Sequence, residues 1–282
     1  MRIPPRAVHL TMLGFLWVVT LSAVATLAGI VGWVLWRGLP SVTPRFLFSM
    51  PEAAGAEGGI ASVILGTLFI IISAVLVATP LGVGTAIYLV EYTRESWVTR
   101  VIRYGSDCLA GIPSIIFGLF GYVFFVLFLG FRWSILSGAL TLALMSLPTI
   151  IRTSEVALRS VPQSFREVSY ALGATRWQMV LRVVIPGALP GIVTGIVLAL
   201  GRSMSETAAV IFTAGTVLPD RVPSSPGDSV RTLAVHFYIL ATEGATDAQP
   251  RAFGTAAILV LAILVINVSA YTLMHRFLAR YR

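Results

Sequence analysis

The sequence predicts an all-α integral membrane protein with six transmembrane helices. Of its 282 residues, 57% are hydrophobic and only 11% are charged, and the mean hydropathy is +0.90. Soluble domains carry about 25% charged residues. A membrane-spanning helix needs about 20 mostly apolar residues. The stretches that meet this length are 10–36, 60–90, 105–130, 134–157, 186–214 and 253–276.

The first stretch follows Arg2 and Arg6 and so imitates a signal peptide. Its apolar run is longer than the h-region of about 7–15 residues, and no small-x-small cleavage site precedes Arg37. We therefore expect a retained membrane span. Trp33 and Trp36 fit an aromatic belt at the outer interface.

Two later stretches contain helix-perturbing residues. The second carries TPLGVG at 79–84, which predicts a kink or an unwound turn because proline removes a helical hydrogen bond. Such a break serves either packing or the lining of a wet pathway. The third carries GIPSIIFGLFG at 111–121, whose small residues we expect to be packing positions.

Two connections between the apolar stretches have a pattern of their own. The connection 159–185 is rich in arginine and has the periodicity of a short helix, and residues 230–242 form a mildly amphipathic piece within the connection 215–252.

The composition excludes several functions. All 20 basic residues are arginine, so the chain lacks the lysine of a P-loop ATPase. A single cysteine, Cys108, excludes an internal disulfide and argues against a cysteine metal site. His9, His236 and His275 have no metal-ligand spacing. No basic stretch carries interleaved aromatic residues, so we expect no nucleic-acid binding.

The distribution of arginine predicts the orientation in the membrane. With both termini in the cytoplasm, the cytoplasmic basic residues are Arg2, Arg6, Arg94, Arg100, Arg103, Arg159, Arg166, Arg176, Arg182, Arg276, Arg280 and Arg282. The external charged residues are Arg37, Arg45, Arg132, Arg221, Arg231, Arg251, Glu52, Glu57, Asp220, Asp228, Glu243 and Asp247. Nearly all of the net charge of +8 then lies inside, as the positive-inside rule and the anionic inner leaflet favour.

The segment GRSMSET at 201–207 places charge inside the fifth stretch. A rise of about 1.5 Å per residue puts Arg202 and Glu206 within the hydrocarbon. An intramembrane arginine costs about 2.5–3.5 kcal/mol and normally faces a cavity or a partner. At i and i+4 the two side chains share a helix face and can pair. They form either a buried pair that locks helix packing or, as we favour, a site on the route of an anion, because the guanidinium fork suits oxyanions.

Arg152 allows the same two interpretations. It lies in the fourth stretch near its cytoplasmic end, where a long side chain can extend towards the lipid headgroups. It is otherwise a second contact for the anion, closer to the cytoplasm.

The segment REVSYALGAT at 166–175 resembles the cytoplasmic EAA loop of bacterial ABC-importer permeases. Glu167 is followed six residues later by Gly173 and thirteen residues after that by Pro186. Val168-Ser169 stand where the family has two alanines, and small residues remain. The resemblance implies a short helix that docks onto a separate ATPase subunit. The residues that it places on this helix are Glu167, Ala171, Leu172 and Gly173.

Residues 58–278 are similar to the PstA-type permeases of bacterial phosphate ABC importers. The segments that carry this resemblance are 66–68, 80–89, 111–118, 147–152, 161–174 and 202–207. It implies a MetI-like permease fold over 58–282, with the coupling loop around 159–186, preceded by an N-terminal helix and external loop over 1–57.

The resemblance also implies an assembly. A PstC-type permease would complete the pathway for inorganic phosphate, two PstB-type ATPases would bind ATP and magnesium, and a PstS-type protein would deliver phosphate outside. This chain would be a non-enzymatic subunit of the bacterial inner membrane, surrounded by lipids, with no cofactor of its own. Arg202 would contact the anion transiently. Glu206 would neutralise Arg202 in the empty pathway or accept a hydrogen bond from a protonated phosphate oxygen, which sulfate lacks.

Three alternatives remain. The chain could be a permease for another oxyanion, such as sulfate, molybdate or phosphonate. It could be a transporter driven by an ion gradient, which inverted repeats would favour, and none is visible. An intramembrane enzyme would need a nucleophile–base or metal constellation. Only Arg202 and Glu206 are present in the apolar region.

Overall fold

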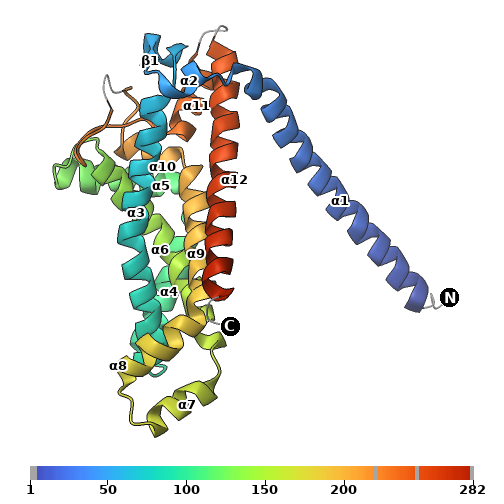
Figure 1. Cartoon of the computed structure of the whole chain (residues 1–282), viewed down its shortest axis with the longest axis vertical. Coiled ribbons are helices and arrows are strands. Elements are labelled where there is room, and N and C mark those ends of the chain that lie inside the picture. Colours follow the sequence, from blue (N-terminus) through green and yellow to red (C-terminus); the bar gives the residue numbers. More distant parts are fainter. Residues whose placement is uncertain (1–4, 219–221, 245–247, 280–282) are drawn as a thin grey trace.

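The computed structural model describes residues 5–218, 222–244 and 248–279. Six residues of the predicted charge distribution therefore lie outside the described residues: Arg2, Asp220, Arg221, Asp247, Arg280 and Arg282. The chain forms an elongated helical bundle from which one long helix, α1, departs at an angle (Figure 1). Within the described ranges, five helices are long and apolar enough to cross a membrane, and a bent pair of helices is a sixth candidate.

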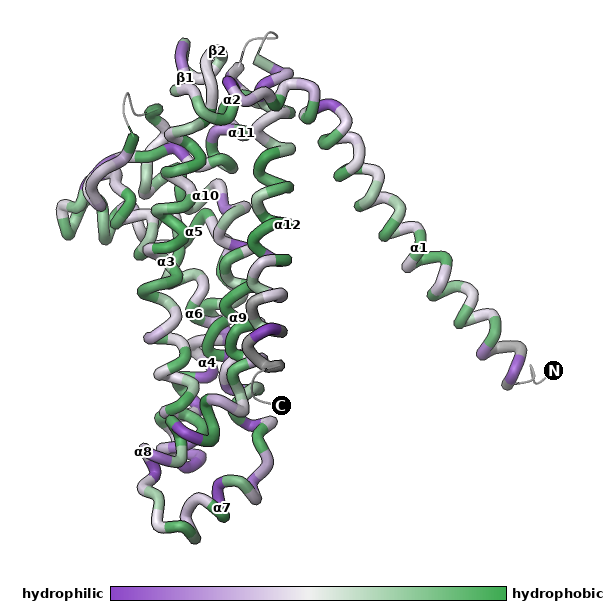
Figure 2. Tube along the Cα trace, viewed as in Figure 1, coloured by the Kyte–Doolittle hydropathy of each residue, from purple (hydrophilic) through white to green (hydrophobic). Residues whose placement is uncertain are grey.

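Four long helices form the bundle: α3 (Ala61–Ile87), α6 (Ile135–Ser160), α9 (Ile185–Met204) and α12 (Gln249–Ala279). The central helix is α6, which packs against α3 on one side and α9 on the other. Glycines allow this close packing, since a Cβ on Gly82 of α3 would lie 2.7 Å from Ile150 Cγ2 of α6. Figure 2 shows hydrophobic residues along the middle of these helices and hydrophilic residues towards the two ends.

Of the kink or unwound turn expected at 79–84, the unwound turn is wrong. Residues 61–87 form one α-helix that continues through Pro80. The irregular turn lies further along, in the π-helical segment η3 (Tyr88–Tyr92). Because Gly82 is in close contact with α6, this part of α3 serves packing and lines no unwound pathway segment.

The third span differs from the single helix expected over 105–130. It begins earlier, as α4 (Trp97–Gly111), and continues as α5 (Ser114–Gly121) and the π-helical η4 (Tyr122–Phe128) after a bend of 104°. The bend occurs at Ile112, whose extended backbone (ψ 131°) is the conformation favoured before a proline.

The small residues expected to pack in this span do so in part. A Cβ on Gly118 would lie 2.9 Å from Ala209 Cα, and Gly121 touches Thr141 and Thr213. Gly111 has no neighbour within 4 Å of its Cβ position. The packing prediction is therefore confirmed for α5 and wrong for the end of α4.

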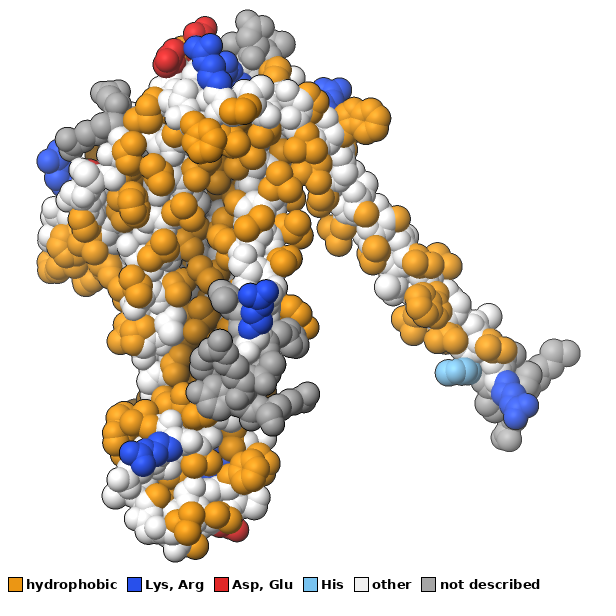
Figure 3. Space-filling model, viewed as in Figure 1, with side chains coloured by type: hydrophobic (Ala, Val, Ile, Leu, Met, Phe, Trp, Pro, Cys, Tyr) orange, Lys and Arg blue, Asp and Glu red, His pale blue; other side chains and the backbone are white. Residues whose placement is uncertain are grey.

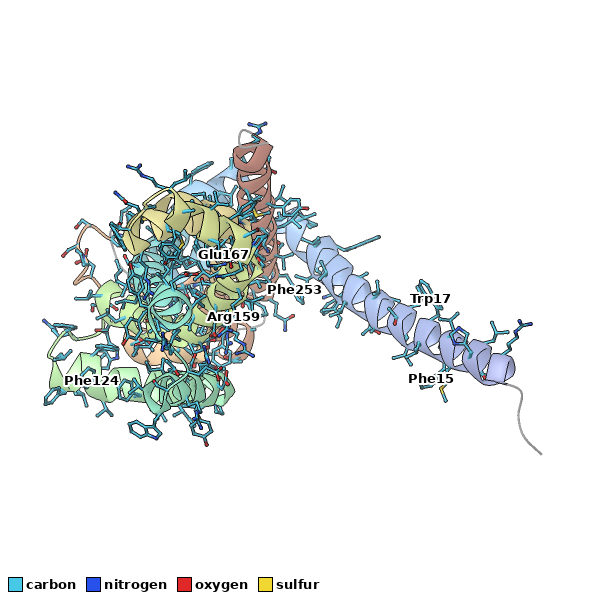
Figure 4. The ribbon with its side chains drawn as sticks, turned by 90° about the horizontal axis from the view of Figure 1, so that it is seen from below. Phe15, Trp17, Phe124, Arg159, Glu167 and Phe253 are labelled. Atoms are coloured by element: carbon cyan, nitrogen blue, oxygen red, sulfur yellow. The ribbon has the colours of Figure 1, made fainter. Side chains whose placement is uncertain are left out.

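The first span is longer than expected and almost detached. Helix α1 (Pro5–Gly38) contacts the bundle only near its C-terminal end, where the rings of Trp33 and Phe253 meet edge to face at 5.1 Å. Its remaining length is exposed, including Phe15 and Trp17, and it extends away on the side opposite Phe124 of η4 (Figure 4). Such a helix requires lipid or a second protein around it.

The end of the bundle opposite α7 is capped by short elements. They are η1 (Leu39–Ser41), α2 (Pro44–Phe48), the hairpin β1 (Pro51–Glu52) and β2 (Glu57–Gly58) with η2 (Ala53–Gly55) between its strands, and α11 (Leu233–Thr242). The piece expected over 230–242 is a helix, α11, which begins after the N-cap Thr232, but its expected amphipathic character is wrong, since the consecutive residues 233–236 are all buried.

The fifth span is also interrupted. It comprises α8 (Arg176–Met179), the π-helical η5 (Val180–Val184) and α9, and it ends at Met204. Residues 208–213 form a separate short helix, α10 (Ala208–Thr213). The continuous helix expected over 186–214 is therefore wrong. At the opposite end from the hairpin, the predicted loop helix is present as α7 (Gln163–Ala171).

Candidate functional site

The antiparallel pair of α6 and α9 holds the arginines that the sequence singled out. Ser146 and Ser203 share a buried hydrogen bond of 3.2 Å between their Oγ atoms. A Cβ on Gly191 would lie 2.5 Å from Ala157 Cβ, and Gly195 is in contact with Thr153. These three contacts define which residues of α6 lie beside which residues of α9 along the helix axes.

Arg202 lies in the last turn of α9 with its side chain exposed. Its face of the helix also carries Thr194 and Leu198, which is 57% exposed. These two residues also line an apolar groove of about 390 Å³ between α9 and α12. Arg202 therefore faces outward from this chain and is not enclosed in a dry contact.

Arg152 lies on α6, exposed beside Val156, which is 60% exposed. The helical periodicity places it on the same side of the α6–α9 pair as Arg202. From the facing levels and a rise of about 1.5 Å per residue, the two arginines are separated by roughly 8–9 Å along the axis. Arg152 also lies about 12 Å before the end of α6, so it is deeper in the span than the sequence suggested.

Glu206 does not share a helix face with Arg202, contrary to the expectation. The helix has ended at Met204, and Ser205 Oγ donates to the carbonyl of Arg202 at 3.0 Å. Glu206 Oε1 instead accepts a hydrogen bond from Ala209 N at 3.4 Å, at the start of α10. Within the described ranges no ion pair joins Glu206 to Arg202, so the paired resting state is not present here.

The predicted coupling residues all lie on the exposed side of α7 and of the turn that follows it. Glu167, Ala171, Leu172 and Gly173 are exposed, and Leu172 is 82% exposed. Figure 4 shows Glu167 on the lower surface of the molecule. Gly173 has φ of +81° and no neighbour within 4 Å of its Cβ position. It is therefore needed for the left-handed turn that ends the helix and not for close approach.

Apolar side chains surround these residues. Phe165, Val168 and Trp177 are 56%, 58% and 58% exposed at the same end of the molecule. Figure 3 shows hydrophobic side chains here as well as over the middle of the bundle and along α1. Exposed apolar groups at the end of α7 are typical of a protein–protein contact.

The opposite side of α7 carries an ion pair that sequence reasoning missed. Arg166 Nη2 lies 2.7 Å from Glu91 Oε1, and the two side chains are only 10% and 6% exposed. The only signal available was that Glu91 directly follows an apolar run. Their separation of 75 positions gave no reason to pair them.

A second ionic cluster was also missed. Glu155 of α6 lies 2.9 Å from both Arg103 of α4 and Arg159. The spacing of Glu155 and Arg159 at i and i+4 was a visible signal for half of it. The cluster ties α4 to α6 near the end that carries α7.

At the end of the bundle opposite α7, Arg231 and His236 form a buried junction. Arg231 donates to the carbonyl oxygens of Thr216 and Ala54, and its Nη1 lies 3.4 Å from His236 Nδ1. Burial, and then the charge of Arg231, lower the pKa of His236 to about 3. Burial also lowers the pKa of Arg231. The junction holds the β1–β2 hairpin against α11.

The described residues contain no group of three or more His, Cys, Asp or Glu that could hold a metal ion. The chemistry that this arrangement offers is anion binding by two exposed guanidinium groups, and protein docking at α7. Apolar spans with a polar face and a docking helix define a permease subunit of a membrane transporter.

The chain belongs to the family of binding-protein-dependent transport system inner membrane components, whose model matches residues 78–282. It is therefore an inner-membrane component of an ABC importer. Structural relatives agree on the fold. A methionine ABC transporter, MetNI, in an inward-facing conformation matches with a TM-score of 0.62 at 19% identity over 77% of this chain and 95% of that chain. An alginate importer matches with a TM-score of 0.65 at 15% identity over 97% and 99%.

Other relatives are more similar to this chain in sequence than these two structures are. A probable ABC transporter permease, YqgI of Bacillus subtilis, is 36% identical over 87% of this chain and 88% of its own length. The phosphate transport permease PstA of Yersinia pestis is 34% identical over 84% and 82%. PstA 1 of Mycobacterium tuberculosis strain H37Rv is 36% identical over 89% and 82%.

Proposed function

We propose that this chain is the permease subunit of an ATP-driven phosphate importer and forms half of the translocation pathway. Its family supports the importer, and relatives named as phosphate permeases support the cargo. The observation that carries the pathway is that Arg152 and Arg202 lie on one exposed face of two packed spans. The planar guanidinium fork binds phosphate oxygens.

Arg202 is the contact closer to the external end and Arg152 the one closer to the cytoplasm. In the described part of the chain neither guanidinium has a hydrogen-bond or ion-pair partner. An intramembrane arginine costs about 2.5–3.5 kcal/mol. A water-filled pathway between two permeases would lower this cost, and a passing anion would use the free donors.

Glu206 is proposed as a contact for protonated phosphate. One of its carboxylate oxygens faces the start of α10, which leaves the other to accept a hydrogen bond from a P–OH group, and sulfate has no such group at neutral pH. In Glu206→Gln we expect the preference for phosphate over sulfate to fall in competition uptake assays. An unchanged preference would remove this role.

The exposed surface of α7 is proposed as the ATPase contact, with Glu167, Ala171, Leu172 and Gly173 in it. The partners would be two PstB-type ATPases, which bind ATP and magnesium, a PstC-type permease, and a PstS-type protein outside. This chain would carry out no catalytic step and hold no cofactor. Both termini would face the cytoplasm of a bacterium. The boundary between the N-terminal helix with its loop, 1–57, and the permease core, 58–282, stays a prediction.

The test is uptake of labelled phosphate by the complete complex in proteoliposomes. We expect uptake to require ATP on the side of α7, and excess unlabelled phosphate to compete with the label far better than sulfate or molybdate. Equal competition by sulfate would favour the general oxyanion permease. Uptake that follows an ion gradient without ATP would contradict the proposal.

A further inference from the structure

One guanidinium group joins three structural elements at the cytoplasmic end of the bundle. Arg166 of α7 contacts Glu91 of η3 through two nitrogens: Nη2 lies 2.7 Å and Nε 3.2 Å from Oε1. Its Nη1 donates to the carbonyl of Val161 at 2.6 Å, and its Nη2 donates to the carbonyl of Leu158 at 2.9 Å. The coupling helix, the end of the second span and the end of α6 therefore meet at one side chain.

The two carbonyls explain why an arginine stands here. Leu158 lies in the last turn of α6 and Val161 directly follows its end, where carbonyl groups lack helical partners. The negative end of the helix dipole favours a cation at this place. Only the planar fork of arginine can bind both carbonyls and a carboxylate at once, which a lysine ammonium cannot do with the same geometry.

The remaining contacts of α7 lie elsewhere in the bundle. Its more extensive backbone contacts are with α8 and η5, which begin the fifth span. Figure 1 shows α7 as the lowest element, beyond the ends of the long helices. Its outward face, with Phe165, Val168 and Leu172, is left for a partner. Arg166 is thus the direct polar link from α7 to the second and fourth spans.

We propose that the Arg166–Glu91 ion pair is the mechanical link by which movement of α7 is carried into α3 and α6. The proposal rests on the proposed function, in which an ATPase moves α7. Arg166 and Glu91 are positioning residues that touch neither the ATPase nor the anion. With the link intact, α6 and its Arg152 follow α7. Without it, α7 moves on its loop while the pathway stays in place.

The experiment uses the complete complex in proteoliposomes, with Glu91→Gln as the test variant. Glutamine keeps the size and an acceptor oxygen but removes the charge. Glu95→Gln is the matched control, because Glu95 lies four positions further on, is 86% exposed and pairs loosely at 3.7 Å with Arg103. Three quantities are measured: the ATPase that copurifies, the rate of ATP hydrolysis, and the phosphate imported per ATP hydrolysed.

In Glu91→Gln we expect copurification and hydrolysis near those of the wild type, and about tenfold less phosphate imported per ATP, within the range typical of coupling between sites. Glu95→Gln should behave like the wild type. A wild-type ratio in Glu91→Gln would overturn the proposal. Loss of the ATPase would also overturn it, since the pair would then only maintain the fold.

Arg166→Lys provides an independent check. It keeps the positive charge but not the fork, so its import per ATP should also fall while the complex remains assembled. A wild-type ratio in this variant would show that charge alone suffices and would overturn the three-way link.

A labelling readout separates this inference from the choice of cargo. Leu198→Cys, in a Cys108→Ser background, should react with a water-soluble maleimide to an extent that changes when ATP is added. This change should be lost with Glu91→Gln. If the wild type shows the change but imports no phosphate, the cargo assignment fails and the link stands. If Glu91→Gln keeps the full change, the link fails and the cargo assignment stands.

Discussion

Arg166 and Arg202 are the same residue type in opposite environments. Arg166 is almost buried, with every nitrogen of its guanidinium group engaged by Glu91 or by the end of α6. Arg202 is exposed on α9, and among the described residues its side chain has no partner. A buried arginine must have its charge and its N–H groups matched within the protein. An exposed one with free donors remains available to a ligand, so the first serves structure and the second binding.

The comparison of Arg166 with Arg202 predicts that their substitution changes the stability of the chain to very different extents, and this is the largest expected effect. Arg166→Met would leave the Glu91 carboxylate buried without a partner, and removing one member of a buried pair costs about 3–5 kcal/mol. Arg202→Met should leave the free energy of unfolding no lower than that of the wild type, because it removes no contact and takes an arginine out of an apolar span. Thermal unfolding of the detergent-solubilised chain measures both. Equal losses in the two variants would remove the distinction between the two arginines.

A smaller effect tests the packing of α6 on α9, which places Arg152 and Arg202 on one side of this helix pair. In Gly195→Ala the new methyl group would meet Thr153 of α6, and overpacking of this kind costs about 1–3 kcal/mol. Gly84→Ala is the matched control, since nothing lies within 4 Å of its Cβ position. That variant should be as stable as the wild type or more stable, because alanine favours a helix by about 1 kcal/mol. Equal unfolding midpoints for both variants would contradict the close packing of α6 on α9.

The smallest effect concerns pH and the junction between Arg231 and His236. The pKa of His236 is about 3 in the folded chain, against an ordinary value of 6.5. The unfolded chain therefore binds a proton that the folded chain excludes between these values. The stability from His236 is fully present above pH 6.5 and is lost as the pH falls, by about 1.4 kcal/mol per pH unit.

Unfolding midpoints at pH 7.5 and pH 5.5 measure this effect. The free energy of unfolding of the wild type should fall by about 1.4 kcal/mol over this interval because of His236. In His236→Gln this contribution should be missing, so its free energy of unfolding should fall by about 1.4 kcal/mol less. The same pH dependence in both would show that His236 titrates freely and that the junction with Arg231 is not buried.

Much of the fold could be predicted from the sequence because its signals are local. The apolar stretches, the existence of a helix within 230–242 and the helix that ends shortly before Gly173 each depend on neighbouring residues. The end of α9 could not be read in this way. No proline or glycine marks 203–207, and the helix ends where Ser205 Oγ bonds to the carbonyl of Arg202. The predicted Arg202–Glu206 pair failed for the same reason.

The ion pair between Arg166 and Glu91 was beyond the sequence for a different reason. It joins residues 75 positions apart, and only the packing of α7 beneath α3 and α6 brings them together. The bend before Pro113 was within reach, since a residue before proline avoids the helical conformation. The continuity of α3 through Pro80 was not, because the close contact between Gly82 and Ile150 of α6 joins residues far apart in the sequence.

The measurement that tests the central claim most directly is ATP-driven uptake of labelled phosphate by the reconstituted complex carrying Arg202→Gln. Loss of one charged hydrogen-bond donor group costs about 1.5–3 kcal/mol, so uptake should fall roughly 10- to 100-fold. The ATPase should still copurify, and the exposed Arg100→Gln should import at the wild-type rate. Wild-type uptake by Arg202→Gln at normal expression would contradict an anion route over this face.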